Sequence, residues 1–189
     1  MKRIGILGDI GSGKSYVAKN FGYPVFNADN EVGKIYRTNK KIYNKLKKIL
    51  PKYFNSFPIK KDEVIKAILA NNKNINLIVK IIHLEIRKEM NFFFKRNKNK
   101  KIIILDIPLL LENKINKKKD ILIFVQSKKR DILKRLKKRS NFNLRLFKKF
   151  KNLQLPLDYK KKLSHFVIKN NFTNKTVIKN IKDIKKKIL

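Results

Sequence analysis

The segment Gly8-Asp9-Ile10-Gly11-Ser12-Gly13-Lys14-Ser15 matches the pattern G-x-x-x-x-G-K-[ST] of a phosphate-binding loop. The residues directly before it, Arg3-Ile4-Gly5-Ile6-Leu7, are mostly apolar and favour a short strand. The residues after it, 16–21, favour a helix. A chance glycine-rich turn would rarely combine four fixed positions with this order of strand, loop and helix. The segment therefore predicts a site for a nucleoside triphosphate.

Each residue type in the motif has a chemical reason to be there. Glycines allow the backbone to curl so that its N–H groups point at phosphate oxygens, and the helix N-terminus adds partial positive charge. We expect Lys14 to reach the β- and γ-phosphates and the Ser15 hydroxyl to bind Mg²⁺, so that ATP and Mg²⁺ are the expected ligands. The predicted nucleotide-binding residues are Gly8, Asp9, Ile10, Gly11, Ser12, Gly13, Lys14, Ser15 and Tyr16.

Length and composition narrow the class of protein. With 189 residues the chain predicts one domain that buries a sizeable core. The absence of cysteine predicts neither disulfides nor a thiolate metal site, which is compatible with a cytoplasmic location. The chain enters its first strand at once, so no signal peptide is expected. The longest apolar run, residues 102–111, is interrupted by Asp106 and Pro108 and is too short to cross a membrane.

The formal net charge of +37 has two interpretations. Clusters of Lys and Arg are the electrostatic signature of nucleic-acid binding. The alternative is codon bias, because the chain is rich in Lys, Asn, Ile and Phe, whose codons are rich in A and T. The lysines are spread over nearly every predicted helix, so we favour codon bias and expect no specific nucleic-acid partner. In either case the positive field attracts anionic substrates such as ATP.

Strand and helix patterns alternate along the chain, which predicts an α/β fold with a five-stranded parallel sheet flanked by helices. The predicted strands are residues 2–7, 24–27, 101–107, 120–125 and 165–168. The predicted helices are residues 30–50 with a break near 38–39, 61–70, 75–96, 128–138, 147–153, 157–163 and 174–189, with a break in the pattern at 140–143. We expect a core of about residues 1–29, 99–127 and 163–189, a helical insert of about 30–98 for the second substrate, and a basic lid of about 128–162.

Two carboxylates are candidates for chemistry. Asp29 directly follows the second strand, at the expected carboxyl edge of the sheet beside the strand that carries the loop. It could accept a proton from an attacking hydroxyl or help to hold Mg²⁺, and the alternative is a helix cap. Asp106 ends the apolar run Ile102-Ile103-Ile104-Leu105, a pattern typical of a strand whose carboxylate orients Mg²⁺, although such a pattern also arises by chance.

Cationic candidates lie in the insert and in the lid. His83 and Arg87 are four residues apart on a predicted helix and therefore share a face, although His83 could equally be a histidine at the edge of the core. The lid carries Arg130, Arg135 and Arg139, of which at least one is expected to fold over the triphosphate. The position of Arg139 in the lid makes it the preferred candidate, and a solvated surface charge is the alternative for each arginine.

The ordered set of motifs resembles the dephospho-CoA kinase family over essentially the whole chain. The matching elements are the loop of residues 6–15, Asn27-Ala28-Asp29, His83-Leu84-Glu85-Ile86-Arg87, Pro108-Leu109-Leu110-Leu111-Glu112, the lid helix from Arg130 to Arg139, Gln154, Lys160 to Lys162, and Asn170. Four positions depart from the family pattern. Asp9 replaces a glycine and is expected to point outward, Asn27 replaces an aspartate, Leu84 replaces a helix-breaking proline, and His165 stands where the family has aspartate.

The resemblance implies transfer of the γ-phosphoryl group of ATP to the 3′-hydroxyl of the dephospho-CoA ribose. It implies that Asp29, Lys14 and Arg139 are catalytic, that Ser15 and Asp106 serve the metal, and that His83, Arg87, Pro108 and Leu109 bind the acceptor. Another P-loop kinase acting on a nucleoside, nucleotide or sugar acid remains an alternative, because fold alone does not decide the substrate. A nucleic-acid-dependent NTPase is a second alternative, which would need a basic stripe or a stacking platform.

Overall fold

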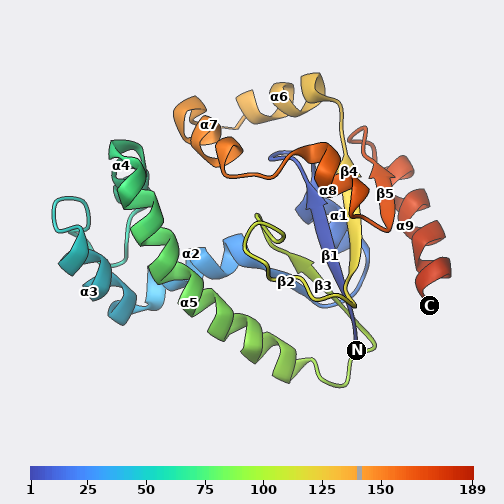
Figure 1. Ribbon diagram of the computed structural model, residues 1–189, viewed down its shortest axis with the longest axis horizontal. Helices are drawn as coiled ribbons and strands as arrows, with labels where there is room; N and C mark the ends of the chain where they lie inside the picture. The colour runs from blue at the N-terminus through green and yellow to red at the C-terminus, as the bar shows by residue number, and fades with distance from the viewer. Residues whose placement is uncertain (140–141) are drawn as a thin grey trace. The chain divides into compact units, whose positions relative to one another are not determined.

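A computed structural model describes residues 1–139 and 142–189 of the chain. It contains a parallel five-stranded sheet with the strand order β2-β3-β1-β4-β5 (Figure 1). The strands are β1 (Lys2–Gly8), β2 (Val25–Asn27), β3 (Ile102–Asp106), β4 (Ile121–Gln126) and β5 (Phe166–Lys169). This arrangement confirms the predicted fold class.

The order of the strands follows from which of them can be buried on both faces. β3 and the part of β1 from Ile4 onward are buried, mostly apolar runs, a pattern typical of strands inside a parallel sheet. Ile4 of β1 pairs with Ile104 on one side and with Ile121 on the other. The short β2 pairs only with β3 and forms one edge of the sheet. The expectation that the second strand lies beside the loop-bearing strand is therefore wrong, because β3 lies between them.

Nine helices are present among the described residues, and most coincide with the predicted ones. They are α1 (Lys14–Asn20), α2 (Ala28–Thr38), α3 (Lys40–Ile49), α4 (Lys61–Ala70), α5 (Asn72–Arg96), α6 (Lys129–Lys137), α7 (Leu144–Asn152), α8 (Leu157–Lys162) and α9 (Asn174–Ile188). Part of the predicted break at 140–143, namely residues 140–141, lies outside the described residues. Among the helices that the structure describes, none is both long and apolar enough to cross a membrane.

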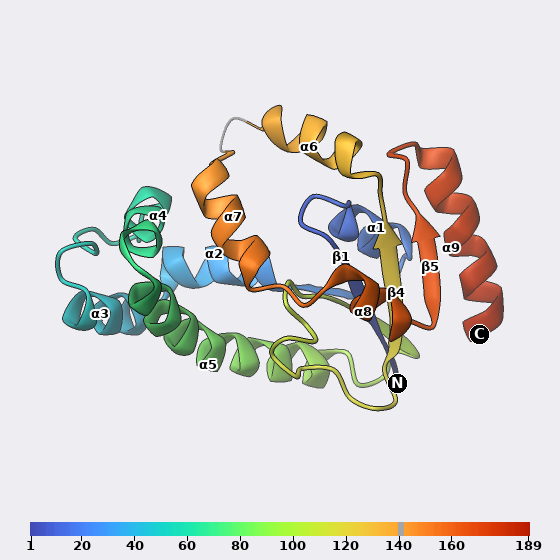
Figure 2. The ribbon, with the colours of Figure 1, turned by 45° about the horizontal axis from the view of Figure 1, so that its top comes forward.

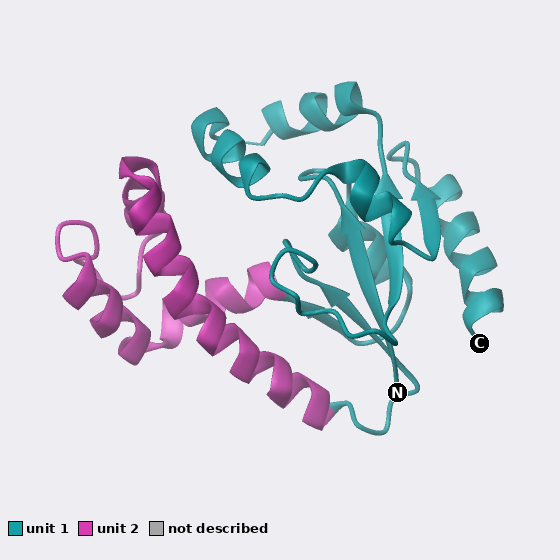
Figure 3. Ribbon diagram, in the orientation of Figure 1, with its two compact units in different colours: residues 1–27, 97–189 teal, residues 28–96 magenta. Residues whose placement is uncertain are grey.

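The chain divides into two compact units, shown in different colours in Figure 3. The first comprises residues 1–27 and 97–189, which form the sheet with α1 and α6 to α9. The second comprises residues 28–96, which form the four helices α2 to α5. The second unit corresponds closely to the insert that the sequence predicts at residues 30–98.

In the first unit, α1 and α9 pack against one side of the sheet, where α9 contacts β5 and α1 contacts β1 and β3 (Figure 2). The core there joins sheet residues to the apolar stripes of both helices. Its fully buried members include Ile4, Ile104 and Ile123 from the strands, Phe21 at the end of α1 and Val177 from α9. The loop that follows β1 is therefore carried by a strand whose residues belong to this buried core.

In the second unit, α5 is the central helix and contacts α2, α3 and α4. Its buried residues Ile75, Ile78, Ile82 and Ile86 recur at helical spacing. The predicted break near residues 38–39 is present, because the Asn39 side chain accepts a hydrogen bond from the Ile42 N–H group and caps α3. α5 runs without interruption through residue 84, in agreement with the leucine that replaces proline there.

A buried ion pair ties the loop after β3 to α8 within the first unit. Lys160 Nζ lies 2.5 Å from Glu112 Oε1, and the two side chains are only 3% and 9% exposed. The same carboxylate oxygen accepts a hydrogen bond from the Leu155 N–H group at 3.0 Å. Glu112 belongs to the Pro-Leu-Leu-Leu-Glu element, so the pair gives that element a structural role.

We predict that Lys160→Met destabilises the protein by about 3–5 kcal/mol, because it leaves the Glu112 carboxylate buried without its cation. The double change Glu112→Gln and Lys160→Met should recover most of this loss, since the glutamine oxygen can still accept from Leu155. Chemical denaturation measures the free energies of unfolding. Lys162→Met, at an exposed position of the same helix, is the control. A loss no larger for Lys160→Met than for Lys162→Met would contradict the prediction.

Candidate active site

The phosphate-binding motif forms a loop between the end of β1 and the start of α1. Gly13 precedes α1 with a φ of 92°, and a Cβ atom at this position would lie 2.4 Å from Asn170 Nδ2. Gly8 ends β1 with a φ of 145°, and a Cβ atom there would lie 2.6 Å from the Val125 carbonyl oxygen. Both positions require glycine because the backbone is left-handed or crowded. The strand–loop–helix prediction for this segment is confirmed.

The loop is held in place by the ends of two other strands. The Ser12 carbonyl oxygen accepts hydrogen bonds from Asn170 Nδ2 at 2.8 Å and from Ser127 Oγ at 3.0 Å. Asn170 follows β5 and is buried, and Ser127 follows β4. Sequence reasoning did not single out either residue as part of this site. The asparagine at the end of the last strand was the available signal, whereas nothing in the sequence marked Ser127.

Lys14 begins α1 and folds back over the loop. Its Nζ donates to the Asp9 carbonyl oxygen at 2.8 Å and approaches the Gly8 carbonyl oxygen at 3.4 Å. The ammonium group therefore lies at the mouth of the loop, where it can exchange carbonyl oxygens for phosphate oxygens. Ser15 is exposed in the first turn of α1, and the Tyr16 hydroxyl bonds to the Asn174 side chain of α9.

Asp9 does not point outward, which corrects the expectation from sequence. Its Oδ1 accepts the Ile10 N–H group at 2.7 Å and lies 2.6 Å from Lys151 Nζ of α7. The Asp9 side chain is only 13% exposed as a result. Asp9, which replaces a glycine of the family pattern, is thus paired with Lys151 of α7.

Asp106 ends β3, the strand directly beside β1, and is buried. Its Oδ2 accepts a hydrogen bond from Asn27 Nδ2 at the end of β2. The pairing of Asn27 with Asp106 across the two strands explains this contact. Asp106 therefore presents a carboxylate at the same sheet edge as the phosphate-binding loop, as the sequence predicts for a parallel sheet.

Asp29 is the second residue of α2 and is exposed. It lies with Glu31 in the first turn of that helix, where acidic side chains interact favourably with the helix dipole. It belongs to the helical unit of residues 28–96, while β2, which precedes it, belongs to the sheet unit. Asn27, the last residue of β2, pairs with Asp106, and Asp29 follows Asn27 by two residues in the chain.

Two contacts define how α2 and α5 run within the helical unit. Lys34 Nζ lies 4.0 Å from Glu89 Oε2, and Asn39 Nδ2 donates to Glu85 Oε1 at 3.1 Å. Residue numbers rise along α2 while they fall along α5. The two helices are therefore antiparallel.

This arrangement separates the acidic candidate from the cationic ones. His83 and Arg87 lie on α5, and His83 is half-buried while Arg87 is exposed. With a rise of 1.5 Å per residue, Asp29 and His83 lie roughly 15 Å apart along the helix axes, and Asp29 and Arg87 roughly 10 Å. A single small group cannot contact Asp29 and His83 together, whereas an extended molecule can.

The arginines of the lid lie on or next to α6. Arg130 and Arg135 belong to the helix, Arg139 follows it, and all three are exposed. The Arg135 guanidinium stacks over the Phe172 ring at 4.5 Å, which fastens α6 to the loop after β5. Arg139 follows the helix outside this contact, and its role toward a triphosphate stays a prediction.

Pro108 and Leu109 follow β3 and are half-buried. Leu109 has a positive φ of 59°, which turns the chain sharply after the strand. The next residue, Leu110, is buried, and its Cδ2 would lie 2.6 Å from a Cβ atom at Gly5 of β1. The Leu110 side chain thus packs against Gly5 of β1, the strand that carries the phosphate-binding loop.

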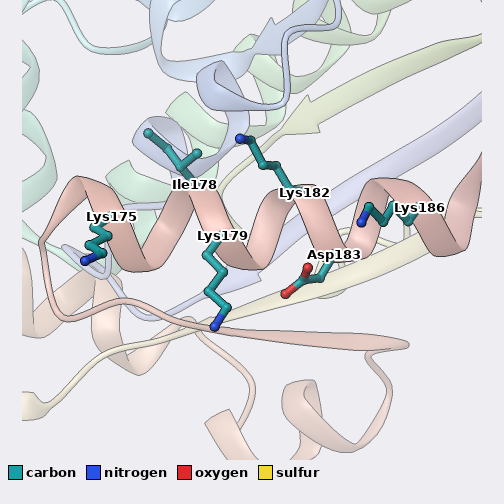
Figure 4. A pocket seen from close by; sticks show the side chains of 6 residues that line it. All are labelled: Lys175, Ile178, Lys179, Lys182, Asp183 and Lys186. Carbon is teal, nitrogen blue, oxygen red and sulfur yellow. The ribbon is translucent and has the colours of Figure 1, made fainter.

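Two cavities accompany the sheet unit. One, of about 310 Å³, lies beside the phosphate-binding loop and is lined by Asp9, Phe124, Val125, Gln126, Ser127, Lys129, Ile132, Lys151, Leu157, Asp158 and Lys161. The other, of about 370 Å³, is a shallow hollow on α9 that is lined by four lysines, Ile178 and Asp183 (Figure 4). The second hollow is formed by one helix and contains none of the candidate residues.

The sheet unit contains the loop with Lys14, the buried carboxylate of Asp106 and the basic helices α6 and α7. Such a set can bind a triphosphate and stabilise charge during phosphoryl transfer. The helical unit adds an exposed carboxylate and a His–Arg pair on two antiparallel helices. The arrangement is that of a P-loop kinase for a small molecule.

Known proteins agree with this interpretation. The family CoaE, described as dephospho-CoA kinase, matches residues 2–176. The dephospho-CoA kinase of Wolbachia sp. subsp. Brugia malayi is 32% identical over 186 residues, which cover 96% of this chain and 95% of the relative. The dephospho-CoA kinase of Bacillus cereus strain ATCC 10987 is 31% identical over 183 residues, which cover 90% and 88%.

Solved structures show the same fold. The crystal structure of TT1252 from Thermus thermophilus matches with a TM-score of 0.81 at 23% identity and covers 100% of this chain and 98% of that one. The dephospho-CoA kinase from Campylobacter jejuni matches with a TM-score of 0.64 at 21% identity and covers 99% and 97%. Because the family match spans residues 2–176 and curated relatives align over most of their length, this chain belongs to the dephospho-CoA kinase family.

Proposed function

We propose that this protein transfers the γ-phosphoryl group of ATP to the 3′-hydroxyl of the dephospho-CoA ribose. In this step the hydroxyl oxygen forms a bond to the γ-phosphorus, the bond from that phosphorus to the bridging β,γ-oxygen breaks, and ADP leaves. The observation that supports the proposal most strongly is the phosphate-binding loop, anchored by Asn170 and Ser127, in a chain that matches the family over residues 2–176.

The donor side is the loop itself. Lys14 Nζ binds the phosphates of ATP, since Lys14 is positioned over the loop. Backbone N–H groups of the loop assist it, apart from those of Ile10 and Ser12, which bond to Asp9. The Ser15 hydroxyl and the Asp106 carboxylate are oxygen donors of the kind that Mg²⁺ accepts, so the residues present fit this ion. When bound, Mg²⁺ neutralises charge on the β- and γ-phosphates. Arg139 folds over the transferred group from the lid and stabilises its charge.

The acceptor side is the helical unit together with the loop after β3. Asp29 orients the 3′-hydroxyl and accepts its proton, which leaves the oxygen free to attack phosphorus. His83 and Arg87 lie roughly 10–15 Å from Asp29 along the helices and bind the acceptor away from its reacting hydroxyl. Dephospho-CoA is an extended molecule and spans such a distance. Pro108 and Leu109 contribute an apolar surface.

The assignment is tested by measuring ADP release with Mg-ATP and a panel of acceptors. We expect turnover with dephospho-CoA and none above the background hydrolysis with nucleosides, nucleoside monophosphates or shikimate. Product analysis should locate the new phosphate on the ribose 3′ position. Faster turnover of any other acceptor in the panel would replace this assignment by that of a different small-molecule kinase.

Asp29→Asn is expected to lower kcat by roughly 10²–10⁴-fold, the range for general acid–base groups, because the amide keeps the size of the side chain but is not a base. Affinity for Mg-ATP should change little. Weaker Mg-ATP binding together with the lower rate would assign Asp29 to the metal instead. Full activity with a stability loss of about 1 kcal/mol would reduce Asp29 to a helix cap. Measurements of kcat, nucleotide affinity and melting on this variant separate the three roles.

The electrostatics of His83 define its protonation state. Burial lowers the pKa of the imidazole below its ordinary value of 6.5, and the guanidinium of Arg87 lowers this pKa further. His83 is therefore neutral at pH 7 and can both donate and accept a hydrogen bond. Arg87 supplies the positive charge for an anionic part of the acceptor.

We predict that the imidazole of His83 titrates below 6.5 in NMR spectra of the folded protein, and that Arg87→Gln raises this pKa. The signal that disappears in His83→Asn identifies the residue. The unfolded chain binds the proton more readily than the folded one, so acid destabilises the fold through His83. From pH about 7.5 to about 5.5, the free energy of unfolding should fall more for the wild type than for His83→Asn. A midpoint at or above 6.5 would contradict this account.

A further inference from the structure

Asp9 places a carboxylate in a loop whose function is to bind phosphate. A negative side chain next to the cradle opposes a polyanionic ligand by direct Coulomb repulsion. The carboxylate can also attract the Lys14 ammonium group away from the phosphates, because Lys14 Nζ already lies 2.8 Å from the Asp9 carbonyl oxygen. An unpaired Asp9 carboxylate would therefore compete with the phosphates for Lys14.

The Asp9 carboxylate forms an ion pair with a lysine of α7. Lys151, near the end of α7, places its Nζ 2.6 Å from Asp9 Oδ1. The two side chains are 37% and 13% exposed, so the pair is partly shielded from water. The Ile10 N–H group bonds to the same oxygen at 2.7 Å. Both donors hold the carboxylate on the side of the loop that lines the 310 Å³ cavity with Lys151.

We propose that Lys151 is a positioning residue for nucleotide binding: it neutralises Asp9, keeps Lys14 available to the triphosphate, and fastens α7 beside the loop. The proposal rests on the donor site assigned above and is independent of the acceptor. Removal of Lys151 should therefore weaken nucleotide binding when Asp9 is present and should have little effect when Asp9 has been replaced. Lys151 acts through Asp9 and not by touching the phosphates.

The test is a double-mutant cycle read by calorimetric titration with Mg-ADP, which binds without turnover. The variants are Lys151→Met, Asp9→Asn and the double change, where asparagine keeps an oxygen that accepts the Ile10 N–H group. Lys151→Met should weaken Mg-ADP binding by about 3- to 5-fold, the upper part of the range for a lost, partly exposed charge pair. Asp9→Asn should bind Mg-ADP at least as tightly as the wild type. The double variant should bind like Asp9→Asn.

Two controls separate this role from general effects. Lys148→Met, at an exposed position of the same helix, removes one charge from the field of the lid and should leave affinity within about 2-fold. Lys151→Arg keeps the charge and should retain the affinity of the wild type. Melting of each variant without nucleotide shows that it is folded.

Three results would overturn the proposal. A double variant as weak as Lys151→Met would show that Lys151 contacts the nucleotide directly. Equal affinities of Lys151→Met and Lys148→Met would show that the pair has no role in binding. A wild-type protein that binds no Mg-ADP would overturn both this role and the donor site. By contrast, a protein that binds Mg-ADP but does not phosphorylate dephospho-CoA would overturn only the acceptor assignment.

Discussion

The central position of β1 is the constraint on which the rest of the structure depends. Its residues bond to β3 on one side and to β4 on the other, and its interior is fully buried. Gly5 leaves room for Leu110 to pack against the strand. A strand held in this way has little freedom at its carboxyl end. The phosphate-binding loop therefore begins from a fixed point, which is what binding of a triphosphate in one defined geometry requires.

The parallel sheet then gathers polar groups from distant parts of the sequence at one edge. Asp106 ends β3, Ser127 directly follows β4, and Asn170 directly follows β5. The side chains of Ser127 and Asn170 donate hydrogen bonds to the carbonyl oxygen of Ser12. Backbone carbonyl groups of a tight loop are costly when buried without a partner, so these side chains stabilise the loop. The same edge of the sheet thus supports the loop and carries the buried Asp106 carboxylate.

Local patterns in the sequence were sufficient for the fold and for the position of the loop. The apolar runs of β1 and β3 and the helical spacing of Ile75, Ile78 and Ile82 depend on neighbouring residues alone, and their elements were predicted within a few positions. The order of the strands was not accessible in the same way. Placing β3 between β2 and β1 depends on burial of both faces of β3, which is a property of the assembled sheet.

The ion pairs near the loop could not be predicted from the sequence, because they join residues far apart in a chain with 50 lysines and arginines. Among so many cations, no local pattern distinguishes Lys151, which pairs with Asp9, or Lys160, which is buried with Glu112, from lysines at exposed positions. The difference between them is burial and a carboxylate partner. A high net charge therefore conceals a small number of specific ion pairs. These two pairs join α7 to the phosphate-binding loop and α8 to the loop after β3, so a few of the many evenly spread cations make specific contacts in the folded chain.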